Sequence, residues 1–361
     1  MNAKVLGAPS EPAPTTLTIP EAALGRLRLR LGRDAANGEA LDASLSHGVP
    51  YATLSALVEY WVHDFELQAH PAWALPSFTT EVHGLSWSFL HVRSRRADAV
   101  PLLLLHGYSG SVAEMAGLMP SLVDPDAHGV DASDAFHTVC PALPGFGLSH
   151  GTPDARTIAE GCAALMRELG YARYVVHGSD LGANLALALA ELDREHVAGV
   201  HVTALPAYPA AIPEEMANLT ATEKSQLALA TDVRNELFFG LPDTPIQELA
   251  FALGRLEHPE VASMPSLRDA LLAGLTLSWA LGDATARQEL YRQTRLASAG
   301  VSGRPLAVDS FPLDVPSLRR FAEKRHRVVK WTEHEHGGPM PALEQPELLL
   351  QLLRGFFRRF R

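Results

Sequence analysis

The segment 174–183 (YVVHGSDLGA) constrains the fold more than any other part of the chain. Its first residues form an apolar run that is typical of a strand buried on both faces of a parallel sheet. A Gly-X-Asp-X-Gly turn follows, and then an Ala- and Leu-rich stretch that favours a helix. Positions 178 and 182 need small residues because so tight a turn brings backbones close together. The pattern therefore predicts a strand–turn–helix unit that presents the side chain of Asp180 above the end of a sheet strand.

The rest of the chain repeats this alternation. Further strand-like runs occur at 102–105, 136–141, 305–308 and 328–331. Helix-like segments occur at 158–169, 183–191 and 346–360. Between residues 206 and 297 the alternation gives way to a helical pattern with breaks near Pro242 and Pro259. The sequence predicts an α/β protein with a mostly parallel, doubly wound sheet and a helical cap inserted into it.

An additional region precedes the first parallel strand. Residues 17–33 and 50–62 carry apolar residues at helical spacing, and 78–93 alternates like a strand pair that turns near His83 and Gly84. We therefore expect a disordered tail at 1–16, an N-terminal arm at 17–98, an α/β core at 99–205 and 298–361, and the cap at 206–297.

Composition narrows the functional classes. The 361 residues carry a formal net charge of −11, which argues against a nucleic-acid partner because such partners call for a basic face. Apolar runs fall short of the ~18 residues that a membrane span needs, and the N-terminus lacks the apolar core of a signal peptide. The two cysteines, Cys140 and Cys162, lie in apolar stretches typical of buried thiols. We expect a cytoplasmic protein with neither metal nor cofactor.

An aspartate at position 180 predicts a particular chemistry. A serine must lose a proton before it attacks, whereas a carboxylate is already ionised near neutral pH. Attack on an amide would give an anhydride, so Asp180 suits displacement at a strained or activated sp³ carbon, such as an epoxide or a carbon bearing a halide. The alternative is that Asp180 only caps the helix that follows.

Further motifs occur along the chain: IP (19–20) before LRLRL (27–31), GVP (48–50), YW (60–61), FTTE (78–81), HGYSGS (106–111), and FHTVCP (136–141) with LPGFG (143–147). With these motifs and the turn at Asp180, the chain resembles the microsomal and juvenile-hormone epoxide hydrolases and their bacterial relatives, which are α/β-hydrolases. The likeness extends from about residue 17 to 356. The resemblance implies an α/β-hydrolase fold with an arm packed around it. It also implies an oxyanion hole from backbone groups near Tyr108 and Leu181, although Ser109 replaces the family's usual proline.

The resemblance also suggests partners for Asp180. The pattern Phe311-Pro312-Leu313-Asp314 fits the family's acidic residue, with Asp309 as the weaker candidate and a solvated loop acid as the alternative. Tyr291 aligns with one of two cap tyrosines that protonate the epoxide oxygen, unless it is simply a residue of an amphipathic helix. The second tyrosine falls on Phe238, which cannot donate and would only line the substrate pocket with Tyr108. Position 181 is Leu, whereas many relatives carry there the Trp that haloalkane dehalogenases use to hold halide. This difference argues against a dehalogenase.

The largest departure from the family is near the C-terminus. Relatives carry Gly-Gly-His-Phe, whereas this chain reads HGGPMPALEQPE at 336–347, so Pro339 occupies the position of the catalytic histidine. Proline cannot act as a base. His336 and His334 lie in the same loop and could replace it, or could be surface residues without a role.

The sequence thus predicts an epoxide-hydrolase-like enzyme that opens a small apolar epoxide or similarly activated substrate with Asp180. Because the family's base is absent, a non-hydrolytic biosynthetic enzyme is an alternative, one that opens an epoxide with C–C or C–O bond formation, cyclisation or coupling in natural-product synthesis. A ligand-binding pseudoenzyme is a third reading. A homodimer is left open.

Overall fold

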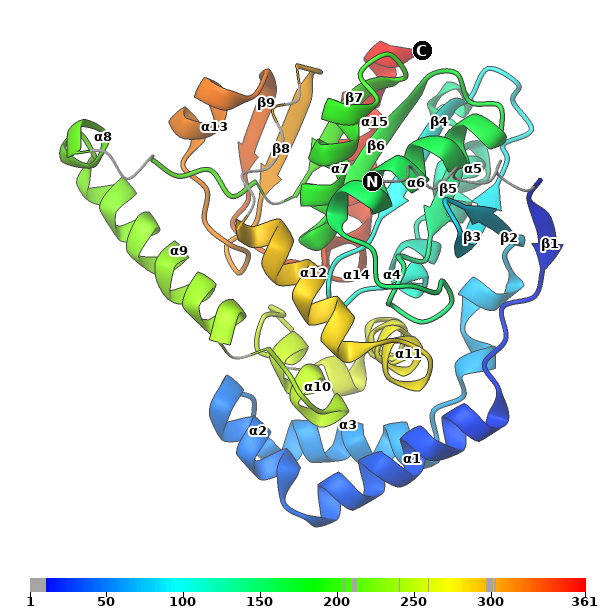
Figure 1. Ribbon diagram of the computed structural model, residues 1–361, viewed down its shortest axis with the longest axis vertical. Coiled ribbons are helices and arrows are strands. Elements are labelled where there is room, and N and C mark those ends of the chain that lie inside the picture. The colour runs from blue at the N-terminus through cyan, green and yellow to red at the C-terminus, as the bar shows by residue number, and fades with distance from the viewer. Residues whose placement is uncertain are drawn as a thin grey trace, which may run out of the picture.

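The computed structural model describes residues 11–203, 205–209, 213–239, 241–258, 260–296, 301 and 303–361, of which 46, 213, 232–239, 295 and 296 are described by their backbone alone. At its centre is a nine-stranded sheet of order β1-β2-β3-β5-β4-β6-β7-β8-β9 (Figure 1). The strands are β1 (Ala13–Thr15), β2 (Ser77–Val82), β3 (Leu85–Val92), β4 (Val100–Leu105), β5 (Phe136–Pro141), β6 (Tyr174–Gly178), β7 (Val197–Val202), β8 (Leu306–Ser310) and β9 (Val328–Glu333). Strands β4 to β9 are parallel, and β1, β2 and β3 extend the sheet antiparallel at one edge.

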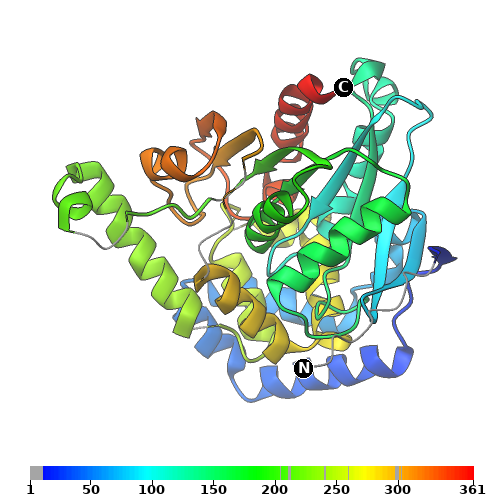
Figure 2. The same cartoon turned by 45° about the horizontal axis from the view of Figure 1, so that its top comes forward.

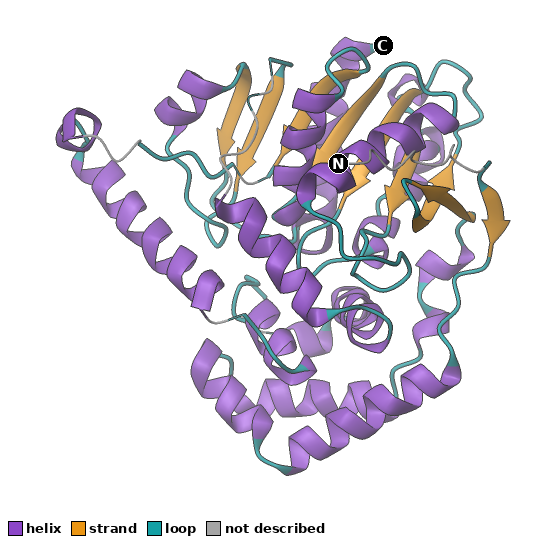
Figure 3. Cartoon of the chain, viewed as in Figure 1, coloured by secondary structure: helices purple, strands orange, loops and turns teal. Residues whose placement is uncertain are grey.

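Helices cover both faces of this sheet (Figure 3). One face carries α6 (Ala155–Glu168) and α7 (Leu181–Leu192), and the other carries α4 (Val112–Ala116), α5 (Met119–Val123) and α15 (Pro346–Phe357). Side chains of a strand alternate between faces, so Leu102 and Leu104 join one core cluster and Leu103 and Leu105 the other. This burial on both sides explains why β4 is a continuous apolar run. The shorter helices α13 (Arg319–Arg325) and α14 (Pro341–Glu344) lie between β8 and α15 in the sequence.

Most of the cap lies below the sheet in Figure 1, and the arm lies against the cap. The cap helices are α8 (Pro213–Ala217), α9 (Ala221–Phe239), α10 (Pro245–Leu253), α11 (Pro265–Ala280) and α12 (Ala284–Leu296). The arm helices are α1 (Glu21–Ala36), α2 (Glu39–His47) and α3 (Tyr51–His63). Helix α1 contacts α11, and α2 contacts α10, so the arm supports the cap from outside (Figure 2).

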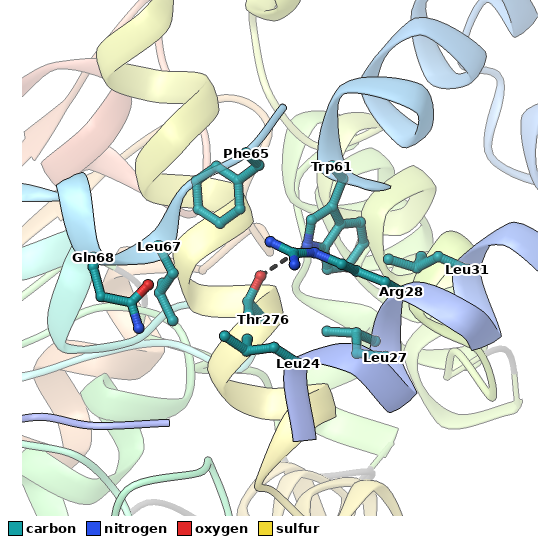
Figure 4. Close-up of a pocket in the computed structure, with 9 residues that line it drawn as sticks. All are labelled: Leu24, Leu27, Arg28, Leu31, Trp61, Phe65, Leu67, Gln68 and Thr276. Atoms are coloured by element: carbon teal, nitrogen blue, oxygen red, sulfur yellow. Dashed lines mark hydrogen bonds between the residues drawn. The ribbon is translucent and has the colours of Figure 1, made fainter. Parts of the chain in front are cut away.

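A hydrogen bond joins arm and cap at a small cavity. Trp61 Nε1 donates to Thr276 Oγ1 at 2.8 Å, and apolar side chains from α1 and from the segment that follows α3 line the cavity together with Arg28 and Gln68 (Figure 4). The cavity has a volume of about 20 Å³, which holds little more than one water molecule. We therefore interpret it as a packing gap between arm and cap rather than a substrate site.

The fold class is confirmed, and so is the strand pair that turns at His83 and Gly84, where both residues have positive φ. Several elements were not predicted, among them β1, α2, β7, α13 and α14. Residues 13–15, assigned to a disordered tail, form β1 because their backbone pairs with β2, so that assignment is wrong for these residues. Helix α2 and strand β7 lie in segments for which no helix or strand was predicted. No helix in the described ranges is long and apolar enough to cross a bilayer.

Candidate functional site

Asp180 sits on a strained turn between β6 and α7. Its φ of 47° and ψ of −112° lie where L-residues are rare, and the neighbouring glycines allow this geometry. A Cβ at Gly178 would overlap the Gly182 carbonyl, and a Cβ at Gly182 would overlap the Leu105 carbonyl. The sequence thus forces the Asp180 side chain out of the strand and over the sheet edge.

Both carboxylate oxygens of Asp180 accept hydrogen bonds from other parts of the chain. The Tyr108 backbone N–H donates to Oδ2 at 2.9 Å, and the Tyr291 hydroxyl donates to Oδ1 at 2.9 Å. Asp180 occupies the N-cap position of α7, yet its side chain makes no capping hydrogen bond. The carboxylate therefore points into a site between the core and the cap, which a helix-capping role does not explain.

Tyr291 and Tyr108 face each other across this site. Tyr291, on cap helix α12, is buried, and its ring centroid lies 4.8 Å from that of Tyr108. Burial raises the pKa of the Tyr108 phenol well above its usual range, so this phenol stays protonated. Leu181 is the first residue of α7, where backbone N–H groups have no partner within the helix. The site thus combines a carboxylate, a phenol donor and backbone donors.

A buried ion pair holds α12 in place and was not predicted from the sequence. Arg287 lies one turn before Tyr291, and it donates to both carboxylate oxygens of Glu248 on α10 at 2.9 and 3.0 Å. Neither side chain is exposed, and the guanidinium lies 5.4 Å from the centroid of the Tyr108 ring. A charged residue within the apolar stretch 245–253 was the available signal, but the sequence does not reveal its partner 39 residues away.

We expect Glu248→Gln to destabilise the protein by about 3–5 kcal/mol, because it leaves the Arg287 charge buried without a counter-ion. Chemical denaturation measures this loss. Glu160→Gln is the matched control, since the Arg156–Glu160 pair is exposed and its loss should cost at most about 0.5 kcal/mol. Equal losses in the two variants would mean that the buried pair does not stabilise the cap.

Asp314, the predicted acidic partner, is buried in the loop after β8. Its Oδ1 accepts a hydrogen bond from the Val315 backbone at 2.6 Å and lies 3.7 Å from Arg255 Nη2. Arg255 follows cap helix α10, and its guanidinium stacks on the Phe251 ring at 5.3 Å. The guanidinium of Arg255 therefore lies beside this acid, a pairing that was not predicted from the sequence.

The two loop histidines bind other carboxylates. His336 has a side chain that is 73% exposed, and its Nδ1 lies 2.5 Å from Glu257 Oε1. This hydrogen bond raises the pKa of His336. His334 Nε2 lies 2.9 Å from Asp309 Oδ1. The contacts of these histidines place neither of them at Asp180.

Asp309, the weaker acidic candidate, belongs to a buried row of side chains that crosses three strands, β6, β7 and β8. His177 on β6 contacts His201 on β7, Nδ1 to Nδ1, at 3.0 Å, and His201 Nε2 contacts Asp309 Oδ2 at 2.9 Å. Burial alone would raise the pKa of Asp309, but hydrogen bonds with His201 and His334 hold it well below its usual range. We interpret this row as a structural network inside the sheet.

His106 lies in the loop that contacts Asp180, yet both its ring nitrogens are occupied. Its Nε2 accepts a hydrogen bond from the Leu143 backbone at 3.2 Å, so Nδ1 carries the hydrogen that faces the Gly107 carbonyl at 2.9 Å. Burial lowers the pKa of His106 to about 4. A neutral imidazole with both nitrogens bound to backbone acts as a structural support of the loop.

Phe238 falls in α9 outside the residues whose side chains the structure describes, so its predicted place in the substrate pocket stays a prediction. Within the described ranges, no group of three or more His, Cys, Asp or Glu side chains is arranged to hold a metal ion.

Two family profiles match the chain. The profile described as "Epoxide hydrolase N terminus" covers residues 12–115, and "alpha/beta hydrolase fold" covers residues 100–277. The first corresponds to the arm with β4 and α4, and the second to the core with much of the cap.

Similar proteins span nearly the whole chain. A Stigmatella aurantiaca protein that is provisionally named an epoxide hydrolase is 33% identical, over 96% of this chain and 85% of its own. The juvenile hormone epoxide hydrolase of Bombyx mori is 26% identical over 93% of this chain and 84% of its own. Among solved structures, the Aspergillus niger epoxide hydrolase superposes with a TM-score of 0.75 at 26% identity, over 96% of both chains.

Proposed function

The chain belongs to the epoxide hydrolase family, of the microsomal and juvenile-hormone type, and we propose on this premise that it opens an epoxide ring with Asp180 and Tyr291. The observation that carries the proposal is the 2.9 Å hydrogen bond between the Tyr291 hydroxyl and Asp180 Oδ1. It brings a proton donor from the cap to the carboxylate on the core. An epoxide between the two groups would meet an anionic oxygen on one side and a phenol on the other.

Ring opening needs both groups. As the ring C–O bond breaks, negative charge develops on the ring oxygen, and Tyr291 supplies the proton that neutralises it. The Tyr108 N–H fixes Asp180 Oδ2, which leaves Oδ1 directed toward the cap. Asp180 then attacks the ring carbon itself or takes a proton from another nucleophile that attacks it.

We propose the second mode, in which Asp180 works as a base. A nucleophile of the substrate, or of a co-substrate, forms a bond to the ring carbon and gives its proton to Asp180, while Tyr291 gives its own proton to the ring oxygen. Asp180 then returns a proton to the Tyr291 phenolate across their 2.9 Å contact. This cycle restores both groups without a histidine.

The placement of the loop histidines favours this mode over hydrolysis through an ester of Asp180. Cleavage of such an ester needs a base to activate water. Pro339 stands where the resemblance places the family's histidine, and His336 and His334 are held by Glu257 and Asp309. The corresponding function is a non-hydrolytic enzyme that forms a C–O or C–C bond as the epoxide opens.

Incubation with a panel of apolar epoxides tests the proposal. We expect the protein to convert at least one of them, and mass spectrometry of the product shows whether water or another nucleophile was added. If a folded sample binds epoxides and opens none of them, with or without added alcohol and carbon nucleophiles, the protein is a ligand-binding pseudoenzyme.

A further inference from the structure

Glu114 is a buried carboxyl group that the proposed chemistry does not use. It lies on α4, where it is 1% exposed, and neither of its oxygens has a hydrogen-bond partner among the described residues. A buried carboxylate without a partner is strongly disfavoured, because it loses its hydration and gains nothing in return. The neutral, protonated form avoids most of this cost.

Glu114 and Asp180 lie against the same short turn. A Cβ placed on Gly107 would come within 3.1 Å of Asp180 Cβ, and one placed on Gly110 would overlap Glu114 Oε2. The Gly110 N–H donates to the Gly107 carbonyl at 3.3 Å, which closes the turn. Between these glycines lies Tyr108, whose N–H binds Asp180. The turn 107–110 is therefore held between two carboxyl groups.

The charges around Glu114 are mostly negative. Burial, followed by the charges of Asp180 and Glu344, raises the pKa of Glu114 to about 8. The Gly107 backbone and the Ser179 hydroxyl lower the pKa of Glu114 in part, although neither makes a well-aligned hydrogen bond to its carboxyl group.

Other titratable groups lie on the elements that pack against α4. They are His70 before the 3₁₀ segment Pro71–Ala74, His91 on β3, His137 and Cys140 on β5, Arg268 and Asp269 on α11, and Glu344 on α14. Arg268 binds Asp269 at 2.7 Å and the Tyr60 hydroxyl at 2.9 Å. No described cation pairs with Glu114.

We propose that Glu114 is a positioning residue for Asp180, and that it keeps a proton in the active enzyme so that one neutral and one charged carboxyl flank the turn 107–110. The proposal rests on the function proposed for Asp180. While Glu114 is neutral, Asp180 is the one of these two carboxyl groups that carries a negative charge, and the Tyr108 N–H donates to it. Ionised Glu114 would put a second negative charge behind the turn and oppose the charge that develops on the ring oxygen.

A pH–rate profile of Glu114→Gln tests the proposal, because glutamine resembles the protonated acid in shape and never ionises. We expect epoxide turnover by the wild type to fall above about pH 8, approaching tenfold per pH unit, as Glu114 ionises. The variant should keep its rate there. Glu168→Gln is the matched control, since burial also raises the pKa of Glu168 but this residue contacts Thr80 on β2. It should show the wild-type profile.

Two outcomes would overturn the proposal. One is an alkaline decline that persists unchanged in Glu114→Gln. The other is a variant that is inactive at every pH and accumulates an ester on Asp180, because Glu114 would then be the base that cleaves this ester.

Thermal unfolding gives a second readout that needs no substrate. The pKa of Glu114 in the folded state is about 8, above its ordinary value of 4.5. Its contribution to the free energy of unfolding of the wild type is therefore largest below about pH 4.5 and is lost as the pH rises to about 8. The melting temperature of Glu114→Gln relative to wild type should therefore rise across this interval. A difference that does not change with pH would contradict a proton on Glu114, even if Asp180 proves essential.

The melting temperatures could show the expected pH dependence while the protein converts no epoxide. That result would confirm the proton on Glu114 and refute the function proposed for Asp180. If Glu114→Gln does not fold, Glu114→Met, which is also uncharged and similar in shape, serves in both measurements.

Discussion

Asp180→Asn is expected to lower epoxide turnover by roughly 10⁴-fold or more, the scale seen when an enzyme loses the central group of its mechanism. The asparagine amide can still accept the Tyr108 N–H through its oxygen. It cannot attack carbon as a carboxylate does or take up a proton. Steady-state turnover of an epoxide converted by the wild type measures the loss.

The fold should survive this substitution, because Asn has the shape of Asp and also tolerates the positive φ of 47°. Unfolding temperature and near-ultraviolet circular dichroism check this. Asp98→Asn is the control: Asp98 pairs with Arg96 on the surface, and its loss should leave turnover unchanged. Full activity in Asp180→Asn would mean that the reaction occurs elsewhere.

Tyr291→Phe is expected to lower the rate by about 10²-fold or more, because it removes the proton donor to the ring oxygen. The phenylalanine ring can still pack against Tyr108, so substrate binding should change less than the maximal rate. Separate measurement of kcat and KM distinguishes these effects.

Tyr174→Phe provides a matched control for Tyr291→Phe. The Tyr174 hydroxyl also donates to a carboxylate, Asp193 Oδ2 at 2.7 Å, but it lies at the start of β6, at the opposite end of this strand from Asp180. Its loss should reduce stability and leave turnover intact. An unchanged rate in Tyr291→Phe would show that another group protonates the ring oxygen.

Much of the fold follows from local sequence, and the reasons are physical. Strand β5 has the predicted bounds, and β6 occupies the start of the segment 174–183, where a strand was predicted, because both strands are apolar runs between turn residues. Strand β7 was missed although it too is fully buried, since Gly199 within it reads as a break. In the structure, that glycine makes room for the Phe360 ring of the C-terminal segment, a contact between residues far apart in the chain.

The candidate site likewise contains residues that local sequence predicts and residues whose partners come from distant parts of the chain. The turn at Asp180 depends on neighbouring residues and was predictable, and the resemblance supplied Tyr291 and Tyr108. The partners of Arg287 and Asp314 come from distant elements, so the sequence could not pair them. Glu114 had one local signal, a charge within the buried run 112–116. Its relation to Asp180 depends on how the turn 107–110 folds between the two.

The central claim is that Asp180 and Tyr291 open an epoxide without a histidine base. Intact-protein mass spectrometry during turnover, with the wild type and with His334→Ala and His336→Ala variants, tests it most directly. We predict unaltered turnover in both variants and no covalent adduct on Asp180. Loss of turnover together with a trapped ester on Asp180 would contradict the claim, because it would show that one of these histidines activates water for ordinary hydrolysis.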